Sequence, residues 1–222
     1  MTSCLGVVLA GGLSSRMGED KSQLLRKNQE SMLNFSCQLL RDSGLSDVVI
    51  SGDEYQIPDA IKQSGPVGGI YSVLYYLKQQ QMKQPDSFLI IPVDLPLMTA
   101  SALTSLRLAG ELKQKATFFT DSQNKQHNIP LFLPNNAFLT LFLEKNFNGK
   151  TLIAQDNKHL NHQANKKNNH KQAPSIRALL KNMPHQSVAL TSTGEANNIL
   201  FNSNTPQDWQ LAQQQFANMG TL

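Results

Sequence analysis

The chain has 222 residues, of which 40% are hydrophobic and 16% are charged, and its net charge is +4 at pH 7. This length suffices for one domain with a sizeable core. The basic residues are scattered apart from the run at 165–171, and no apolar stretch approaches a membrane span, so neither nucleic acid nor membrane is an expected partner. The two cysteines, Cys4 and Cys37, do not have metal-ligand spacing, and the sequence shows no signal-peptide pattern. Both observations predict a cytoplasmic protein.

Short apolar runs alternate with longer amphipathic segments in the first half of the chain. The runs at 6–10, 47–51 and 88–94 are rich in β-branched residues and nearly uninterrupted, which is typical of parallel strands covered on both faces. The segments 31–44, 68–81 and 99–112 indicate helices, with Gly44 ending the first and Thr99 capping the third. The alternation predicts an α/β fold, a doubly wound and mostly parallel sheet with helices on both faces.

The second half is less regular. The runs at 115–120, 128–133 and 187–191 indicate strands, the first two joined by a polar hairpin. Helices are predicted at 136–147, at 174–183 with Pro174 at the start, and at 205–219 with Thr205 as N-cap and Pro206 in the first position. Residues 157–172 are rich in Asn, His, Lys and Gln, which indicates a solvated loop rather than a metal site.

A polar loop containing Gly11 and Gly12 directly follows the first predicted strand, where phosphate-binding loops occur. It matches neither the dinucleotide fingerprint, because the two glycines are adjacent, nor the P-loop, because two acidic residues separate Gly18 from Lys21. It still offers close backbone approach and amides for an anion, with Arg16 and Lys21 as cations for phosphate oxygens. A surface turn with incidental charges is the alternative, but an anion site explains the cations better.

In such a sheet, ligands bind outside the carboxyl ends of the strands. The loops after Ala10, after Ser51 and around Asp94 are expected to meet there. Asp94 ends the third predicted strand, and a carboxylate at that edge can hold Mg²⁺. From the pattern alone, a helix-capping role for Asp94 is an equally good interpretation.

The segment LAGGLSSRMGEDK at 9–21 matches, without a gap, the motif Leu-Ala-Gly-Gly-x-Ser-x-Arg-Met-Gly-x-Asp-Lys of the MobA-like nucleotidyltransferases. GPVGGI at 65–70, IIPVDLPLM at 90–98 and FNSNTPQDW at 201–209 resemble further segments of that family in the same order. The last favours the guanylyltransferase branch. The resemblance implies a Rossmann-like nucleotidyltransferase with one domain, 1–222, comprising a nucleotide-binding half at about 1–110 and an acceptor-binding half at about 111–222.

The resemblance also implies the reaction. GMP is transferred from GTP to the terminal phosphate of molybdopterin with release of pyrophosphate, Mg²⁺ is the cofactor, and molybdenum-insertion proteins and apo-molybdoenzymes are transient partners. Because two anions must meet, charge neutralisation should be the largest catalytic contribution. Arg16, Lys21 and Asp94 are the implied catalytic residues, with Asp94 as metal ligand and Asp20 orienting Lys21 through an ion pair.

Further site residues follow from the motif positions. The implied nucleotide-binding residues are Leu9, Ala10, Gly11, Gly12, Lys21, Ser51, Asp59, Gly65, Gly68 and Asp94. Ser51 stands where the family has an Asn near the base, and Asp59, with Asp53 as the lesser alternative, is the nearest match to a family Asp. Weaker acceptor-binding candidates are His127, Asn202 and Asn204, for which a hairpin end and a helix-capping turn are the plainer interpretations.

The sequence is compatible with two alternatives. A related nucleotidyltransferase that uses CTP, or a sugar phosphate as acceptor, is compatible with Ser51, since a hydroxyl lacks the fixed geometry of an amide. The second alternative is a non-catalytic nucleotide-binding protein that hands the cofactor to enzymes. The presence of all three implied catalytic residues, Arg16, Lys21 and Asp94, argues against it.

Overall fold

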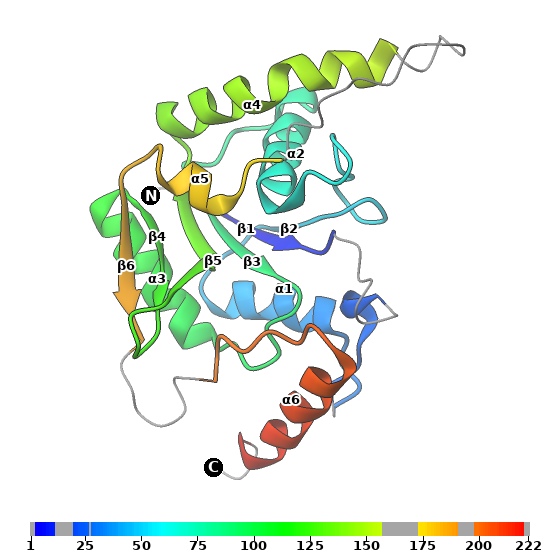
Figure 1. Ribbon diagram of the computed structural model, residues 1–222, viewed down its shortest axis with the longest axis vertical. Coiled ribbons are helices and arrows are strands. Elements are labelled where there is room, and N and C mark those ends of the chain that lie inside the picture. The colour runs from blue at the N-terminus through cyan, green and yellow to red at the C-terminus, as the bar shows by residue number, and fades with distance from the viewer. Residues whose placement is uncertain (1–2, 12–19, 27, 157–172, 191–197, 220–222) are drawn as a thin grey trace.

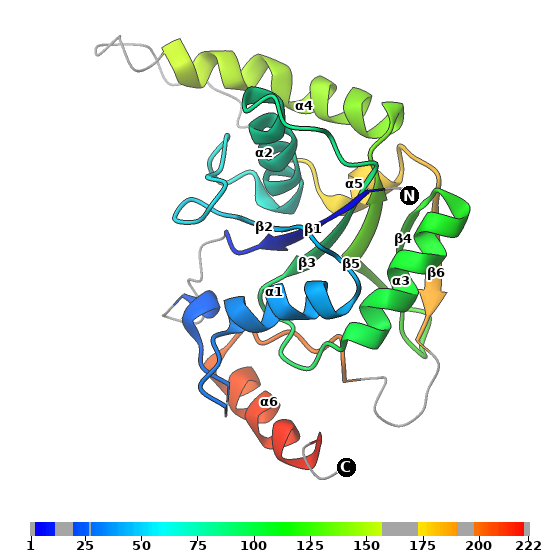
Figure 2. The same cartoon turned by 180° about the vertical axis from the view of Figure 1, so that it is seen from behind.

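The structure is a computed structural model that describes residues 3–11, 20–26, 28–156, 173–190 and 198–219. Within these residues, six strands form one sheet with helices on both faces (Figures 1 and 2). The strands are β1 (Cys4–Leu9), β2 (Val48–Ser51), β3 (Ser87–Pro92), β4 (Ala116–Thr120), β5 (Gln126–Pro134) and β6 (His185–Ala189). The helices are α1 (Met32–Asp42), α2 (Gly65–Gln79), α3 (Ala100–Lys113), α4 (Ala137–Asp156), α5 (Ile176–Leu180) and α6 (Pro206–Met219), with a short 3₁₀ helix η1 (Lys21–Gln23).

The strand order is β2-β1-β3-β5-β4-β6, and every strand except β5 runs in the same direction. From β1 the chain passes through α1 to β2 on one side, then returns through α2 to β3 on the other. The strand order therefore reverses at β1, and the carboxyl edge of β1 and β3 is the topological switch point where ligands bind in open α/β sheets. The predicted fold class is confirmed.

Both faces of the sheet are covered, which explains the uninterrupted apolar strands. In β3, Phe88 and Ile90 pack into the layer formed by α2, α4 and α5. Leu89 and Ile91 point the other way, into the layer that contains α1, α3 and α6. Since successive side chains of a strand alternate between faces, a strand buried on both sides must be apolar throughout.

One glycine sets how closely a helix approaches the sheet. A Cβ added to Gly110 of α3 would lie 2.1 Å from Cδ1 of Phe132 in β5. Gly110→Ala is therefore expected to lower the free energy of unfolding by about 1–3 kcal/mol, because overpacking outweighs the better helix propensity of Ala. Chemical denaturation measures the change. Ser105→Ala, at an exposed position of the same helix, is the control, and a more stable Gly110→Ala protein would contradict the expectation.

Most predicted elements appear, with shifted boundaries. α2 already begins at Gly65, and α4 continues to Asp156. α5 is capped by Ser175, so Pro174 lies before the helix rather than at its start. The predicted cap of α6 is confirmed, because the Asp208 N–H donates to Thr205 Oγ1 at 3.2 Å. The polar tract at 157–172 lies outside the described residues.

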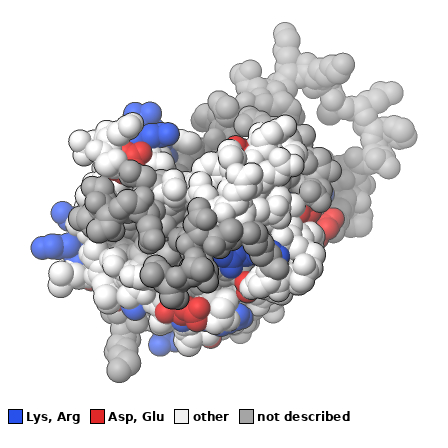
Figure 3. Space-filling model, turned by 90° about the horizontal axis from the view of Figure 1, so that it is seen from below, with Lys and Arg blue, Asp and Glu red and all other residues white. Residues whose placement is uncertain are grey.

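The surface carries charges of both signs. On the face in Figure 3, the described Lys and Arg side chains are interspersed with acidic and uncharged ones instead of forming a single basic patch. Over the described ranges, no helix is both long enough and apolar enough to cross a membrane.

Candidate active site

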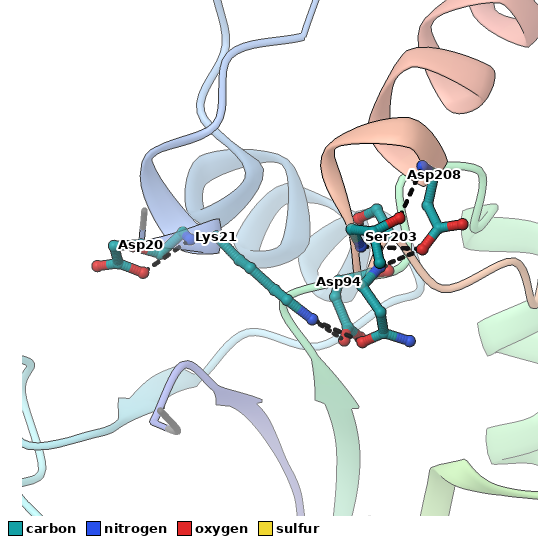
Figure 4. A network of polar contacts seen from close by, with 8 residues as sticks. Asp20, Lys21, Asp94, Ser203 and Asp208 are labelled. Atoms are coloured by element: carbon teal, nitrogen blue, oxygen red, sulfur yellow. Dashed lines mark hydrogen bonds and ion pairs between the residues drawn. The ribbon is translucent and has the colours of Figure 1, made fainter. Parts of the chain in front are cut away.

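Three side chains from distant parts of the chain meet beyond the carboxyl edge of the sheet. Lys21 begins η1, Asp94 lies just past the end of β3, and Asn204 precedes α6. Lys21 Nζ lies 3.0 Å from Asp94 Oδ2 and donates a 2.7 Å hydrogen bond to Asn204 Oδ1 (Figure 4). The structure thus joins two of the predicted catalytic residues to one predicted acceptor-binding residue.

The segment before α6 is held against the strand end that carries Asp94. The Ser203 N–H donates to the Asp94 carbonyl at 3.0 Å. Asp208 Oδ2 accepts hydrogen bonds from the N–H groups of Asn204, at 3.1 Å, and Thr205, at 2.9 Å. A hydrogen bond from the Thr205 side-chain hydroxyl, more than these two amide contacts, holds the pKa of Asp208 below its ordinary value, so its carboxylate stays ionised at neutral pH. Asn204 is therefore supported by a capped helix start.

The Lys21–Asp94 pair is accessible to a ligand while being partly shielded from water. The side chains are 17% and 18% exposed. An ammonium has three donors, and among the described residues Asp94 and Asn204 accept two of them. Lys21 therefore keeps the capacity to bind a phosphate oxygen at this edge.

The same oxygens suit a hard divalent cation. The side-chain oxygens of Asp94 and Asn204 are ligand types that Mg²⁺ accepts. Among the described residues, no group of three or more His, Cys, Asp or Glu side chains could enclose a metal. A cation at Asp94 would thus complete its coordination with phosphate oxygens and water, as Mg²⁺ commonly does.

Asp20 does not pair with Lys21, in contrast to the prediction. Its carboxylate caps η1 by accepting from the Ser22 N–H at 3.0 Å, and it accepts from the Tyr55 hydroxyl at 2.8 Å. Burial acts to raise the pKa of Asp20, but the hydrogen bonds from Ser22 and Tyr55 outweigh it, and the pKa is lowered. Tyr55 is a site residue that the sequence does not indicate, because a single Tyr in a loop carries no recognisable signal.

Ser51 does not face the ligand edge. Its side chain is buried, and its hydroxyl donates to the Gly69 carbonyl of α2 at 3.4 Å. Its own carbonyl accepts from the N–H groups of Ala10, at 2.9 Å, and Gly11, at 3.2 Å. These two amides hold the end of β1 to the end of β2, so they are not directed at an anion. The side chain of Leu9, another predicted nucleotide-binding residue, is buried.

The other nucleotide-side candidates differ in their surroundings. A Cβ on Gly11 would lie 3.5 Å from Asp59 Oδ2, so this carboxylate lies beside the strand end. Burial, with Asp53 nearby, raises the pKa of Asp59. Gly65 is exposed at the start of α2, whereas Gly68 is buried and a Cβ there would lie 1.7 Å from Ser64 Oγ. Gly68 therefore has a packing role.

On the acceptor side, His127 lies near the start of β5, at the same edge of the sheet. Its Nε2 is 3.1 Å from Asp121 Oδ2, and this hydrogen bond holds the pKa of Asp121 below its ordinary value. Asn202 is exposed ahead of α6. Gly12 and Arg16 lie outside the described residues.

A doubly wound sheet with a lysine and a carboxylate facing each other beyond its switch point has the architecture of a nucleotide-transferring enzyme. Comparison with known proteins makes the class specific. Residues 6–160 match the MobA-like NTP transferase domain. The chain belongs to this family of nucleotidyltransferases, as the four sequence segments had indicated.

A full-length relative supports the assignment. The chain is 30% identical, over 207 residues, to a molybdenum cofactor guanylyltransferase from Xanthomonas euvesicatoria pv. vesicatoria, covering 92% of this chain and 91% of that protein.

Two solved structures are similar in fold. Molybdopterin-guanine dinucleotide biosynthesis protein A from Archaeoglobus fulgidus superimposes with a TM-score of 0.64 at 16% identity, covering 97% of this chain and 100% of that one. Rv0371c from Mycobacterium tuberculosis H37Rv, in complex with manganese, superimposes with a TM-score of 0.50 at 12% identity, covering 96% of this chain and 99% of that one. At these identities the structures support the fold alone.

Proposed function

We propose that this protein transfers GMP from GTP to the terminal phosphate of molybdopterin. An oxygen of the acceptor phosphate bonds to the α-phosphorus of GTP, the bond from that phosphorus to the bridging oxygen breaks, and pyrophosphate leaves. The observation that carries the proposal is the Lys21–Asp94 pair, at 3.0 Å, beyond the switch point of a MobA-like sheet.

The residues need to supply charge neutralisation rather than a base. A phosphate monoester is already largely ionised at neutral pH, so it needs no proton acceptor to attack. Lys21 donates to phosphate oxygens, and Arg16 is the proposed second cation. Asp94 holds Mg²⁺, which when bound neutralises charge on the triphosphate and on the leaving pyrophosphate.

The two substrates occupy different parts of the same edge in this proposal. GTP lies over the ends of β1, β2 and β3, in the half at about 1–110, with Asp59 and Gly65 beside it. Molybdopterin lies toward His127 and Asn202, in the half at about 111–222. A cytoplasmic location, and transient contacts with molybdenum-insertion proteins and apo-molybdoenzymes, belong to the same proposal.

The CTP alternative rested on Ser51, and the geometry weakens it. The Ser51 hydroxyl is buried and donates to the Gly69 carbonyl, so it is not placed to hydrogen-bond guanine or cytosine. Ser51 therefore gives no reason to expect a preference for cytosine. Base selection therefore depends on other groups at the strand ends.

A thermal-shift series with GTP, CTP and UTP, with and without Mg²⁺, tests the nucleotide. At about 100 times its dissociation constant, a ligand specific to the native state stabilises it by about 2.7 kcal/mol. For a chain of this length that corresponds to roughly 5–10 °C in melting temperature. GTP with Mg²⁺ is expected to give the largest shift. A larger shift with CTP would overturn the guanine assignment, and GTP binding without dinucleotide formation from molybdopterin would favour the non-catalytic alternative.

A further inference from the structure

Tyr55 forms hydrogen bonds with the two residues that flank Lys21 in the sequence, Asp20 and Ser22. Its hydroxyl donates to Asp20 Oδ2 at 2.8 Å and accepts from the Ser22 hydroxyl. Asp20 is the N-cap of η1, and Ser22 is a buried residue within η1. Burial raises the pKa of Tyr55, which keeps its hydroxyl protonated at neutral pH. A single phenol therefore links the loop after β2 to the short helix that presents Lys21.

Tyr55 is itself fixed by the backbone beneath it. Its N–H donates to the Gly52 carbonyl at 3.0 Å. A Cβ on Gly52 would lie 2.9 Å from both Tyr55 Cδ2 and the Gly11 nitrogen, so only glycine lets the ring and the end of β1 approach this closely. Gly11, just past the end of β1, is thus connected through Gly52 and Tyr55 to η1 at the strand ends.

The helix η1 needs such an anchor. It has three residues, and it contributes few backbone hydrogen bonds of its own, among them Gln23 N–H to the Asp20 carbonyl at 3.0 Å. A lysine side chain has many rotamers, so the position of its ammonium depends on where its backbone is held. The ammonium must stay near Asp94 and Asn204 to meet an arriving phosphate.

We propose that Tyr55 is a positioning residue for Lys21: its hydroxyl holds η1 in place from the loop after β2, so that the ammonium is preorganised at the Asp94–Asn204 oxygens. This role rests on the proposed function, since Lys21 is the group through which Tyr55 acts. It also connects the loop after β2, which lies on the nucleotide side, to the placement of charge at the phosphates. Preorganised charge stabilises the transition state more than it stabilises bound substrate.

Tyr55→Phe tests the proposal because it removes the hydroxyl and keeps the ring. The turnover number for GMP transfer is expected to fall about fivefold to tenfold, as for other losses of charge preorganisation, while KM for GTP changes less than about twofold. The melting temperature should fall by no more than about 4 °C, because the two hydrogen bonds that are lost belong to a partly exposed hydroxyl. Tyr75→Phe, on α2, is the matched control and should keep wild-type turnover.

A double-mutant cycle identifies the route of the effect. In a Lys21→Met background, Tyr55→Phe should lower turnover by less than about twofold, because the group that it positions is gone. An undiminished effect in that background, or a wild-type rate in Tyr55→Phe alone, overturns the proposal. So does a loss of activity that simply follows a loss of melting temperature.

A second measurement does not depend on the reaction. The rate at which an N-hydroxysuccinimide acetate ester modifies Lys21, followed by peptide mass spectrometry without substrates, should rise at least about threefold in Tyr55→Phe. Modification of Lys125 on the exposed hairpin should be unchanged. If wild-type protein forms no dinucleotide, the proposed function fails; an unchanged rate at Lys21 overturns the role of Tyr55 separately.

Discussion

Asp94→Ala is expected to lower the rate of GMP transfer by about 10²- to 10³-fold while the protein remains folded. The substitution removes the carboxylate that is proposed to hold Mg²⁺, and it removes the charged partner 3.0 Å from Lys21. The fold should survive because the Asp94 backbone carbonyl, rather than its side chain, accepts the hydrogen bond from Ser203. The segment before α6 therefore keeps its attachment.

Pyrophosphate release from GTP in the presence of molybdopterin measures the rate, and thermal unfolding checks the fold. Asp42→Ala, which removes an exposed carboxylate at the end of α1, is the matched control. The Asp94 variant should also fail to regain activity at raised Mg²⁺, since its metal ligand is absent. A rate within about twofold of wild type would remove Asp94 from the metal site.

The fold could be predicted because its signal is local. The apolar run that forms β3 is buried on both faces. The residues that end α1 and cap α6 contact groups only a few residues away along the chain. Helix starts were less predictable. Gly65 and Pro66 lie outside the helix predicted at 68–81, yet they form the first turn of α2, because Pro is tolerated where the N–H has no helical partner.

The site could be predicted only in part, because its contacts are long-range. Motifs identified Lys21 and Asp94, but nothing in the sequence indicates that Asn204, 183 residues from Lys21, accepts its hydrogen bond. Nor does it indicate the contact of Tyr55 with Asp20, which is set by how two loops pack. Ser51 is different: it shares the alternation of Val49, which packs against the α2 layer, so strand periodicity could have indicated that its side chain points inward.

Lys21→Met is expected to lower the turnover number by about 10²- to 10³-fold, with a smaller effect on KM for GTP. Met keeps an unbranched apolar side chain of nearly the same length and lacks the ammonium. The lost charge matters most in the transition state, where the phosphates of donor and acceptor meet. Lys125→Met, on the exposed hairpin between β4 and β5, removes the same charge elsewhere and should leave the rate unchanged.

The same variant separates the role of Lys21 from that of Asp94. Without nucleotide, the ammonium occupies Asp94 Oδ2 and competes with a divalent cation for it. Lys21→Met should therefore bind Mn²⁺ alone a few-fold more tightly than wild type, whereas Asp94→Ala should bind it more weakly. Electron paramagnetic resonance titration measures both. Because the two residues act on the same charge, the double variant should be little slower than either single one. Fully multiplicative losses, with Mn²⁺ affinity unchanged in Lys21→Met, would mean that the ammonium and the metal do not share Asp94.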